Sequence, residues 1–352
     1  MLGNRFKVDP SPVQALPVIA MDPQAMAHAD CPANRAYMIG VGGPLCHDGP
    51  DLVDRIQRLV PFRSVGYCLG TAGSWSGRPA LQNLGSTPMA PELSYRAEAA
   101  AGYDRAVSHV SAHFLPFLLR AAALAPGHSV LDVATGTGIA AEAAIGIVGP
   151  DGSVIATDIS PEMVDRARER LDRWPNATIA VEDGQALSFS DESFDAVMCS
   201  LGLMFFPDPG RALRGFHRVL RLGGRAAVSV LTAPERSYNG WINVIVARHV
   251  PELAEATART FALGDATRLR LLFAEAGFRD IESGTEKHTF ILPSFDSYYG
   301  PFEHGGGSTG QALASLPEAT RQAIKKEMQQ SLGDTGGPVE IGVEMRITSA
   351  RR

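Results

Sequence analysis

Acidic residues stand in or directly after three successive apolar runs in the middle of the chain. The first run, residues 130–134, contains Asp132 and leads into a glycine-rich turn. The second run ends in Asp158, and the third is followed by Asp183. Short apolar runs that alternate with helical patterns predict parallel strands, and open parallel sheets bind ligands at the carboxyl ends of their strands. We therefore expect a nucleoside pocket at that edge of the sheet.

The turn after the first run has the spacing of a nucleotide-binding loop. Residues 136–141 (GTGIAA) satisfy the pattern G-x-G-x-x-A, and Asp158 follows Gly138 by twenty residues. Glycine permits positive φ and close approach of the backbone to a ligand. Asp158 can accept hydrogen bonds from ribose hydroxyls in either of two cofactors. An NAD(P)-dependent reductase is therefore one alternative.

The charge of Asp132 favours the other cofactor. A dinucleotide would lay its pyrophosphate beside this carboxylate, whereas S-adenosylmethionine has no phosphate and carries an ammonium and a sulfonium. Asp183 can also accept a hydrogen bond from an adenine amino group, and Gly184 would let the backbone close over the ring. These residues together favour S-adenosylmethionine.

At this point the sequence resembles a known family. It is similar to the class I S-adenosylmethionine-dependent methyltransferases, in the branch that includes the ubiquinone/menaquinone C-methyltransferases (methyltransferase type 11 domain), over roughly residues 95–232. The matching segments are 103–104 (YD), 131–138 (LDVATGTG), 158–163 (DISPEM), 183–187 (DGQAL), 194–197 (FDAV) and 218–225 (RVLRLGGR).

The resemblance implies a set of cofactor-binding residues and a reaction. The implied residues are Tyr103, Asp132, Ala134, Gly136, Thr137, Gly138, Asp158, Ile159, Met163, Asp183, Gly184, Gln185 and Ser200. The implied reaction is methyl transfer from S-adenosylmethionine to a small, largely apolar acceptor, and no catalytic residue is identified. A non-catalytic S-adenosylmethionine-binding regulatory protein is a further alternative.

One segment departs from the quinone-methylase pattern. After residues 200–203, the apolar residues Met204, Phe205 and Phe206 replace the more polar residues expected there. This departure argues against a quinone acceptor. We expect the three side chains to form an apolar wall of the acceptor pocket.

The predicted fold is a doubly wound, seven-stranded, Rossmann-like α/β sheet with helices on both faces, a flexible N-terminal extension and a helical lid. Strands are expected near 129–134, 153–157, 177–181, 195–200, 225–231, 279–292 and 339–349, the last of them antiparallel. Helices are expected near 95–124, 138–148, 161–172, 208–221, 267–276 and 317–332, with a bend or restart at Pro116.

Composition divides the chain near Met89. Twenty of the first 88 residues are proline or glycine, a composition that breaks every apolar run and predicts a low-order extension over 1–88. The alternative is a small substrate-binding cap. Residues 89–352 are expected to form the methyltransferase domain, with a motif core at 126–232 and lid segments at 235–265 and 293–337.

The remaining polar residues suggest fewer roles. His109 and His113 lie four apart on a predicted helix, but no third ligand has useful spacing, so we expect no metal. One interpretation has Tyr298, Tyr299 and His304 line the acceptor pocket from the lid, and a structural role is the alternative. Arsenic methylation needs clustered cysteines, and Cys199 stands alone in the domain.

Charge and hydropathy limit the class of partner. The formal net charge of −6 argues against a nucleic-acid partner. The sequence has no run of 18 apolar residues, so it predicts no integral membrane segment. The four cysteines form no CxxC pair, which fits reduced thiols in a cytoplasmic enzyme. The expected partner is a small-molecule substrate, and the pattern carries no signal for an oligomeric state.

Overall fold

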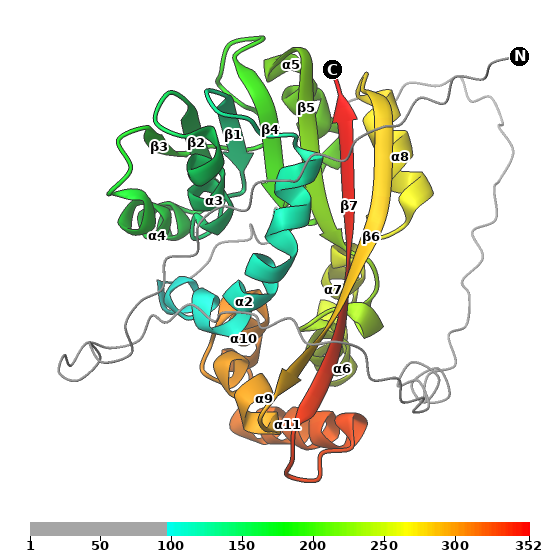
Figure 1. Cartoon of the computed structure of the whole chain (residues 1–352). Coiled ribbons are helices and arrows are strands. Elements are labelled where there is room, and N and C mark those ends of the chain that lie inside the picture. The colour runs from blue at the N-terminus through cyan, green and yellow to red at the C-terminus, as the bar shows by residue number, and fades with distance from the viewer. Residues whose placement is uncertain (1–96) are drawn as a thin grey trace, which may run out of the picture. The chain divides into compact units, whose positions relative to one another are not determined.

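The computed structural model describes residues 97–352, so the predicted extension and its boundary at Met89 lie outside the described residues. The described part is built on a seven-stranded sheet with the order β3-β2-β1-β4-β5-β7-β6 (Figure 1). The strands are β1 (Ser129–Val133), β2 (Ser153–Asp158), β3 (Ala177–Val181), β4 (Phe194–Ser200), β5 (Leu220–Leu231), β6 (Arg279–Leu292) and β7 (Val339–Arg351). The seven predicted strands are thereby confirmed.

Strand direction creates a switch point in the sheet. Strands β1 to β5 pair in parallel, whereas β7 runs antiparallel to both β5 and β6. The chain proceeds outward from β1 to β3 and then returns to place β4 on the other side of β1. Because the strand order reverses between β1 and β4, a crevice is expected outside the carboxyl ends of these two strands.

Helices cover both faces of the sheet because successive strand residues point to opposite sides. Val130 and Met198 share a core with α2 (Ala97–Ala121) and α3 (Ile139–Val148). Leu131 and Val197 share a second core with α5 (Pro209–Val219) and α8 (Ala266–Glu275). Helix α4 (Pro161–Leu171) packs on β2 and β3. The doubly wound prediction is therefore confirmed.

Helix α2 continues through Pro116, so the helix does not restart there. A proline inside a helix removes one backbone hydrogen bond and costs about 3 kcal/mol. The neighbouring side chains Phe114, Leu115, Leu118 and Leu119 are all buried. Burial of these apolar side chains offsets that cost and keeps α2 a single helix.

Strands β6 and β7 extend past the end of β5 and carry the lid. Strand β5 pairs with β7 only as far as Leu231, opposite Met345, while β6 and β7 continue to pair as far as Leu292 and Val339. Figure 1 shows helices α6, α9, α10 and α11 gathered around this two-stranded extension. The lid helices are α6 (Gly240–His249), α7 (Ala254–Thr260), α9 (Phe295–Glu303), α10 (Gly307–Ala314) and α11 (Glu318–Leu332).

No helix was predicted between residues 293 and 316, but this segment forms α9 and α10. The Ser294 hydroxyl caps α9 by accepting from Ser297 N at 3.2 Å. Four aromatic side chains of α9 are buried at helical spacing. A Cβ on Gly310 would lie 2.7 Å from Phe302 O, so the glycine lets α10 approach α9 closely. None of the helices in residues 97–352 is long and apolar enough to span a membrane.

Candidate cofactor and acceptor site

The glycine loop is built from alternating left-handed residues. Ala134, Gly136 and Gly138 have φ values of 56°, 56° and 84°. Leu201, directly after the neighbouring strand β4, has a φ of 54°. A left-handed conformation is uncommon for a residue with a Cβ, and such strain concentrates at functional sites. Ala134 and Leu201 mark the carboxyl ends of β1 and β4, where the strand order predicts a crevice.

Asp132 is fully buried and only partly satisfied. Its Oδ2 accepts a hydrogen bond from the Thr135 hydroxyl at 2.6 Å, while Oδ1 has no partner within residues 97–352. Burial, together with the nearby negative charge of Asp158, raises the pKa of Asp132 to about 7, although the hydrogen bond from Thr135 opposes the increase. A buried carboxylate with a free oxygen is suited to a cationic partner.

Asp158 holds the glycine loop and the start of α4 together. Its Oδ2 accepts from Gly136 N at 2.9 Å, and its Oδ1 accepts from Ser160 N at 3.0 Å. Burial raises the pKa of Asp158, and these backbone N–H groups oppose the increase. The next residue, Ile159, is 46% exposed, whereas Met163 on α4 is 2% exposed. Ile159 therefore presents the accessible apolar surface beside Asp158.

The segment after β3 is organised by packing and turn contacts. Asp183 accepts from Gln185 N at 2.9 Å, and Gln185 in turn accepts from Asp208 N at 2.7 Å. A Cβ on Gly184 would lie 2.6 Å from the Phe206 ring. Glycine is therefore required here by Phe206, and the predicted contacts of Asp183, Gly184 and Gln185 with a cofactor stay predictions.

Helix α2 is fastened directly to the glycine loop. The Thr137 hydroxyl donates to Asp104 at 2.7 Å, and Arg170 on α4 donates to Thr137 O at 2.7 Å while pairing with Asp104. Sequence reasoning identified Thr137 and the Tyr103–Asp104 pair but missed Arg170. No local pattern distinguishes Arg170 from the other arginines of α4, since its role depends on contacts 33 and 66 residues away.

A cavity of about 90 Å³ begins at the carboxyl ends of β4 and β5 and extends under the lid. Tyr103 on α2 and Leu201 after β4 line it on the side of the glycine loop. The full lining is Tyr103, Val107, Val110, Ser111, Leu201, Met204, Phe205, Leu231, Ser237, Tyr238, Asn239, Asn243, Thr260, Phe302, Gly307, Ser308, Thr309, Val343 and Met345. This cavity is the candidate acceptor pocket.

The predicted apolar wall is only partly correct. Met204 and Phe205 line the cavity, whereas Phe206 packs over Gly184. Ser200 ends β4 and pairs with Ser229 of β5, so it lies at the sheet edge beside Leu201.

The lid aromatics have the structural role and not the pocket-lining one. Tyr298 and Tyr299 are 0% and 1% exposed in the core of the lid, where the Tyr298 hydroxyl donates to Tyr238 O at 2.7 Å. His304 Nδ1 bonds to Gly300 O at 2.7 Å at the end of α9. These three residues do not line the cavity. Phe302, one turn after Tyr298, lines it instead.

The two α2 histidines pack against aromatic rings. His113 stacks on His288 with ring centroids 3.7 Å apart, and His109 meets the Tyr238 ring edge-on at 5.0 Å. Burial lowers the pKa of both histidines. Within residues 97–352, no group of three or more His, Cys, Asp or Glu side chains is arranged to hold a metal.

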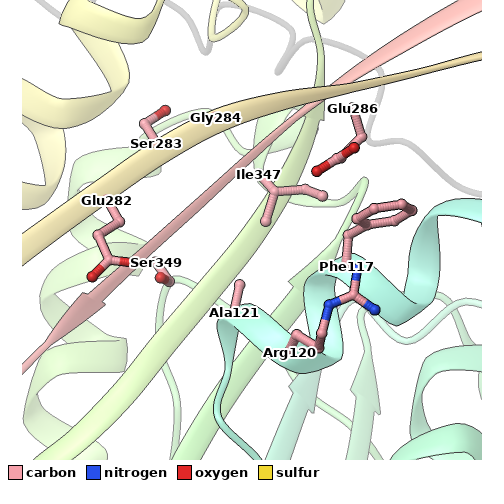
Figure 2. Close-up of a pocket in the computed structure, with 9 residues that line it drawn as sticks. All are labelled: Phe117, Arg120, Ala121, Glu282, Ser283, Gly284, Glu286, Ile347 and Ser349. Carbon is pink, nitrogen blue, oxygen red and sulfur yellow. The ribbon is translucent and has the colours of Figure 1, made fainter. Parts of the chain in front are cut away.

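A larger hollow of about 360 Å³ lies elsewhere, between α2 and the β6–β7 pair. Figure 2 shows Phe117 and Arg120 of α2 together with Glu282 and Glu286 of β6 around it. It contains none of the predicted site residues. Size alone therefore does not make this hollow the candidate site, and the strand order favours the carboxyl edge of the sheet, where the other cavity begins.

Comparisons with known proteins match the part of the chain that contains the sequence motifs. The family model described as "Methyltransferase domain" matches residues 131–228. The chain is 39% identical over 117 residues to arsenite methyltransferase of Halobacterium salinarum, covering 32% of this chain and 30% of the relative. It is 37% identical over 121 residues to ubiquinone/menaquinone biosynthesis C-methyltransferase UbiE of Pasteurella multocida, covering 34% and 45%.

Among solved structures, Haemonchus contortus phosphoethanolamine N-methyltransferase 2 in complex with S-adenosyl-L-methionine aligns with a TM-score of 0.48 and 18% identity. This alignment covers 73% of the present chain and 57% of the other. The chain spans less than half the length of the two curated relatives described above. The family match shows that residues 131–228 form a methyltransferase domain.

Asp158→Ala should weaken binding of S-adenosylhomocysteine by about 1.5 to 3 kcal/mol, the range for hydrogen bonds to a charged group. The product is the suitable ligand because it keeps the ribose and lacks the sulfonium charge. Calorimetric titration measures the change. Asp195→Ala is the matched control, because Asp195 accepts from Ser129 N at 2.8 Å near the opposite ends of the strands. Equal affinities in folded Asp158→Ala and the parent would remove Asp158 from the site.

Proposed function

We propose that the chain transfers a methyl group from S-adenosylmethionine to a small, largely apolar acceptor. The observation that carries this proposal is the free Oδ1 of Asp132, fully buried beside the glycine loop. The ammonium group of the cofactor would satisfy this oxygen. The matched methyltransferase domain supports the same reaction class.

The residues of the site fit this cofactor. A Cβ on Gly136 would meet no atom within 4 Å, so the backbone there is open to a ligand. Asp158 lies across the loop with carboxylate oxygens for ribose hydroxyls, and Ile159 offers apolar surface for a base. A dinucleotide would bring its pyrophosphate toward buried Asp132, and like charges repel strongly in a poorly solvated site. The site therefore supports S-adenosylmethionine over NAD(P).

S-adenosylmethionine supplies an electrophilic methyl carbon, whose transfer to a nucleophile leaves a neutral thioether. Asp132 would bind the ammonium group of the cofactor and Asp158 its ribose, while the Thr137–Asp104 hydrogen bond fastens α2 to the loop. Tyr103 and Leu201 line the acceptor cavity and would contact the acceptor there. Alignment of reacting atoms at about 3 to 3.5 Å and exclusion of water supply much of the catalysis in such a displacement.

Arsenite methylation receives no support from the site, although one relative carries that name. Cys199 is the free cysteine of the described region, and it is buried in β4. Burial raises the pKa of its thiol, and the charge of Asp132 adds to the increase. A thiol held protonated is a poor metalloid ligand. We propose an organic acceptor and a cytoplasmic site of action without a nucleic-acid partner.

The decisive experiment uses the full chain and S-adenosylmethionine with a deuterated methyl group. After incubation with a small-molecule extract, mass spectrometry should find a metabolite that has gained the labelled methyl. Binding of S-adenosylhomocysteine without any labelled product would favour a regulatory protein that only binds the cofactor. A nicotinamide nucleotide retained through purification would favour the reductase.

A further inference from the structure

We infer that Asn239, Asn243 and Thr309 recognise an uncharged oxygen group on the acceptor, such as a carbonyl or an ether. This inference rests on the proposed function, because it assigns the cavity to the acceptor. It adds the specificity-determining residues and the chemistry of the group that they select.

The three side chains form one hydrogen-bonded network across the lid. Asn239 Nδ2 donates to Thr309 Oγ1 at 2.7 Å, and Thr309 Oγ1 donates to Asn243 Oδ1 at 2.8 Å. Thr309 is 3% exposed. Asn239 and Asn243 belong to the start of α6, whereas Thr309 lies on α10, and all three line the cavity. The network therefore brings the two lid segments together at the acceptor pocket.

The direction of these hydrogen bonds leaves donors for a ligand. The Thr309 hydroxyl uses Asn243 Oδ1 as its acceptor, so the amide nitrogen of Asn243 keeps two N–H donors. No hydrogen bond from this nitrogen to residues 97–352 is found, and the nitrogen is not among the fully buried unpartnered atoms, so it is accessible to a ligand in the cavity. Asn239 Oδ1 accepts from the Ser237 hydroxyl at 3.3 Å, so the carbonyl oxygens of both amides are in use. A ligand oxygen that accepts hydrogen bonds complements this arrangement.

The charge of the cavity lining restricts the ligand further. The lining contains no Asp, Glu, Lys, Arg or His. Transfer of an ionised group from water to such a cavity would cost free energy that no opposite charge recovers. The group bound by the network is therefore uncharged, and the rest of the acceptor contacts apolar side chains such as Met204 and Phe302.

A purely structural role for the network makes a different prediction. If the network only fastened α10 to α6, its removal would lower the melting temperature without changing the selectivity of the cavity. The amide nitrogen of Asn243 lines the cavity on a partly buried residue and has no protein partner in the network, so a fastening role makes no use of it.

The test uses three probes of similar shape on the full chain saturated with S-adenosylhomocysteine. Acetophenone carries a carbonyl, cumene carries only hydrocarbon, and benzoate carries a charge. Dissociation constants come from ligand-observed NMR titration. We expect acetophenone to bind about fivefold to tenfold more tightly than cumene, the value of one hydrogen bond, and benzoate to bind most weakly.

Two variants assign that preference to the network. Thr309→Val and Asn243→Leu should each reduce acetophenone binding to the level of cumene and leave cumene binding within about twofold, because only the polar contact is lost. Thr232→Val is the matched control, since its hydroxyl donates to Glu344 O at 3.2 Å outside the cavity lining. Thermal melting checks that each variant is folded, and either network variant alone is sufficient for the comparison.

The outcomes separate this inference from the proposed function. Three results would overturn the inference. Benzoate could bind more tightly than acetophenone, acetophenone and cumene could bind equally, or the preference for acetophenone over cumene could persist in both variants. Failure of S-adenosylhomocysteine to bind would instead overturn the proposed function. The three probes would then be titrated against the chain alone, and the same comparison would still decide the role of the network.

Discussion

Asp132→Asn should make the free protein more stable while it weakens cofactor binding. The carboxylate is 0% exposed, and burial raises its pKa to about 7. Because the folded-state pKa lies above the unfolded value of about 3.9, ionised Asp132 costs stability, and the cost grows from about pH 4 to about pH 7. Asparagine carries no charge but leaves amide hydrogens unpaired. We expect a net gain of about 1 to 3 kcal/mol at pH 8.

Thermal melting at two pH values measures this gain. The melting temperature of Asp132→Asn should exceed that of the parent by several degrees at pH 8, and the difference should shrink as the pH falls and be smallest below about pH 3, where Asp132 is protonated in both states. Asp195→Asn is a matched control, because Asp195 is paired with Arg221 at 2.6 Å and should lose stability on the same substitution. A less stable Asp132→Asn variant at pH 8 would show that the buried charge is already compensated.

Cofactor affinity should depend on pH through the same carboxylate. A cation binds the ionised form, so below about pH 7 the free protein must release a proton as it binds. The dissociation constant for S-adenosylmethionine should therefore rise by more than tenfold between pH 7 and pH 5 in the parent. In Asp132→Asn it should be weak and independent of pH over this range. Calorimetric titration measures this dependence. A dissociation constant of the parent that does not change between pH 7 and pH 5 would show that Asp132 does not bind the ammonium group.

The sheet and its acidic edge could be predicted because their signals are local. Each parallel strand is a short apolar run, and each helix of the motif core has its own start signal, such as Ser160 before Pro161 at α4. Asp132 and Asp158 follow from the strand ends, since parallel strands bring their carboxyl ends to one edge. The structure places both carboxylates at the glycine loop, as this reasoning requires.

The lid could not be predicted to the same depth because its contacts are distant in sequence. Glycines between 300 and 310 indicated a loop, yet they permit close packing of α9 and α10. Asn239 and Thr309 are 70 residues apart, and neither belongs to a recognisable motif. Gly184 illustrates a different limit: the residue type was singled out, but its physical reason is the Phe206 ring, which only the folded chain brings there.

Gly136→Val should abolish cofactor binding and leave the fold largely intact. Gly136 has a φ of 56°, and a Cβ there would enter open space at the loop. A β-branched side chain would resist this left-handed conformation at a cost of about 1 to 3 kcal/mol and would fill the path of the cofactor. We expect the affinity for S-adenosylhomocysteine to fall by more than about a hundredfold, because the loss of space adds to the strain. Calorimetric titration measures this loss.

Gly223→Val separates strain from steric exclusion. Gly223 also has a positive φ, 81°, and open space around its Cα, but it lies exposed at the amino-terminal part of β5, away from the glycine loop. Both variants should lose similar stability in thermal melting, since both force valine into the left-handed region. Only Gly136→Val should lose binding. Near-normal binding by Gly136→Val would show that the cofactor does not approach the backbone at this loop, and the assignment of the site to the β1–β4 crevice would fail with it.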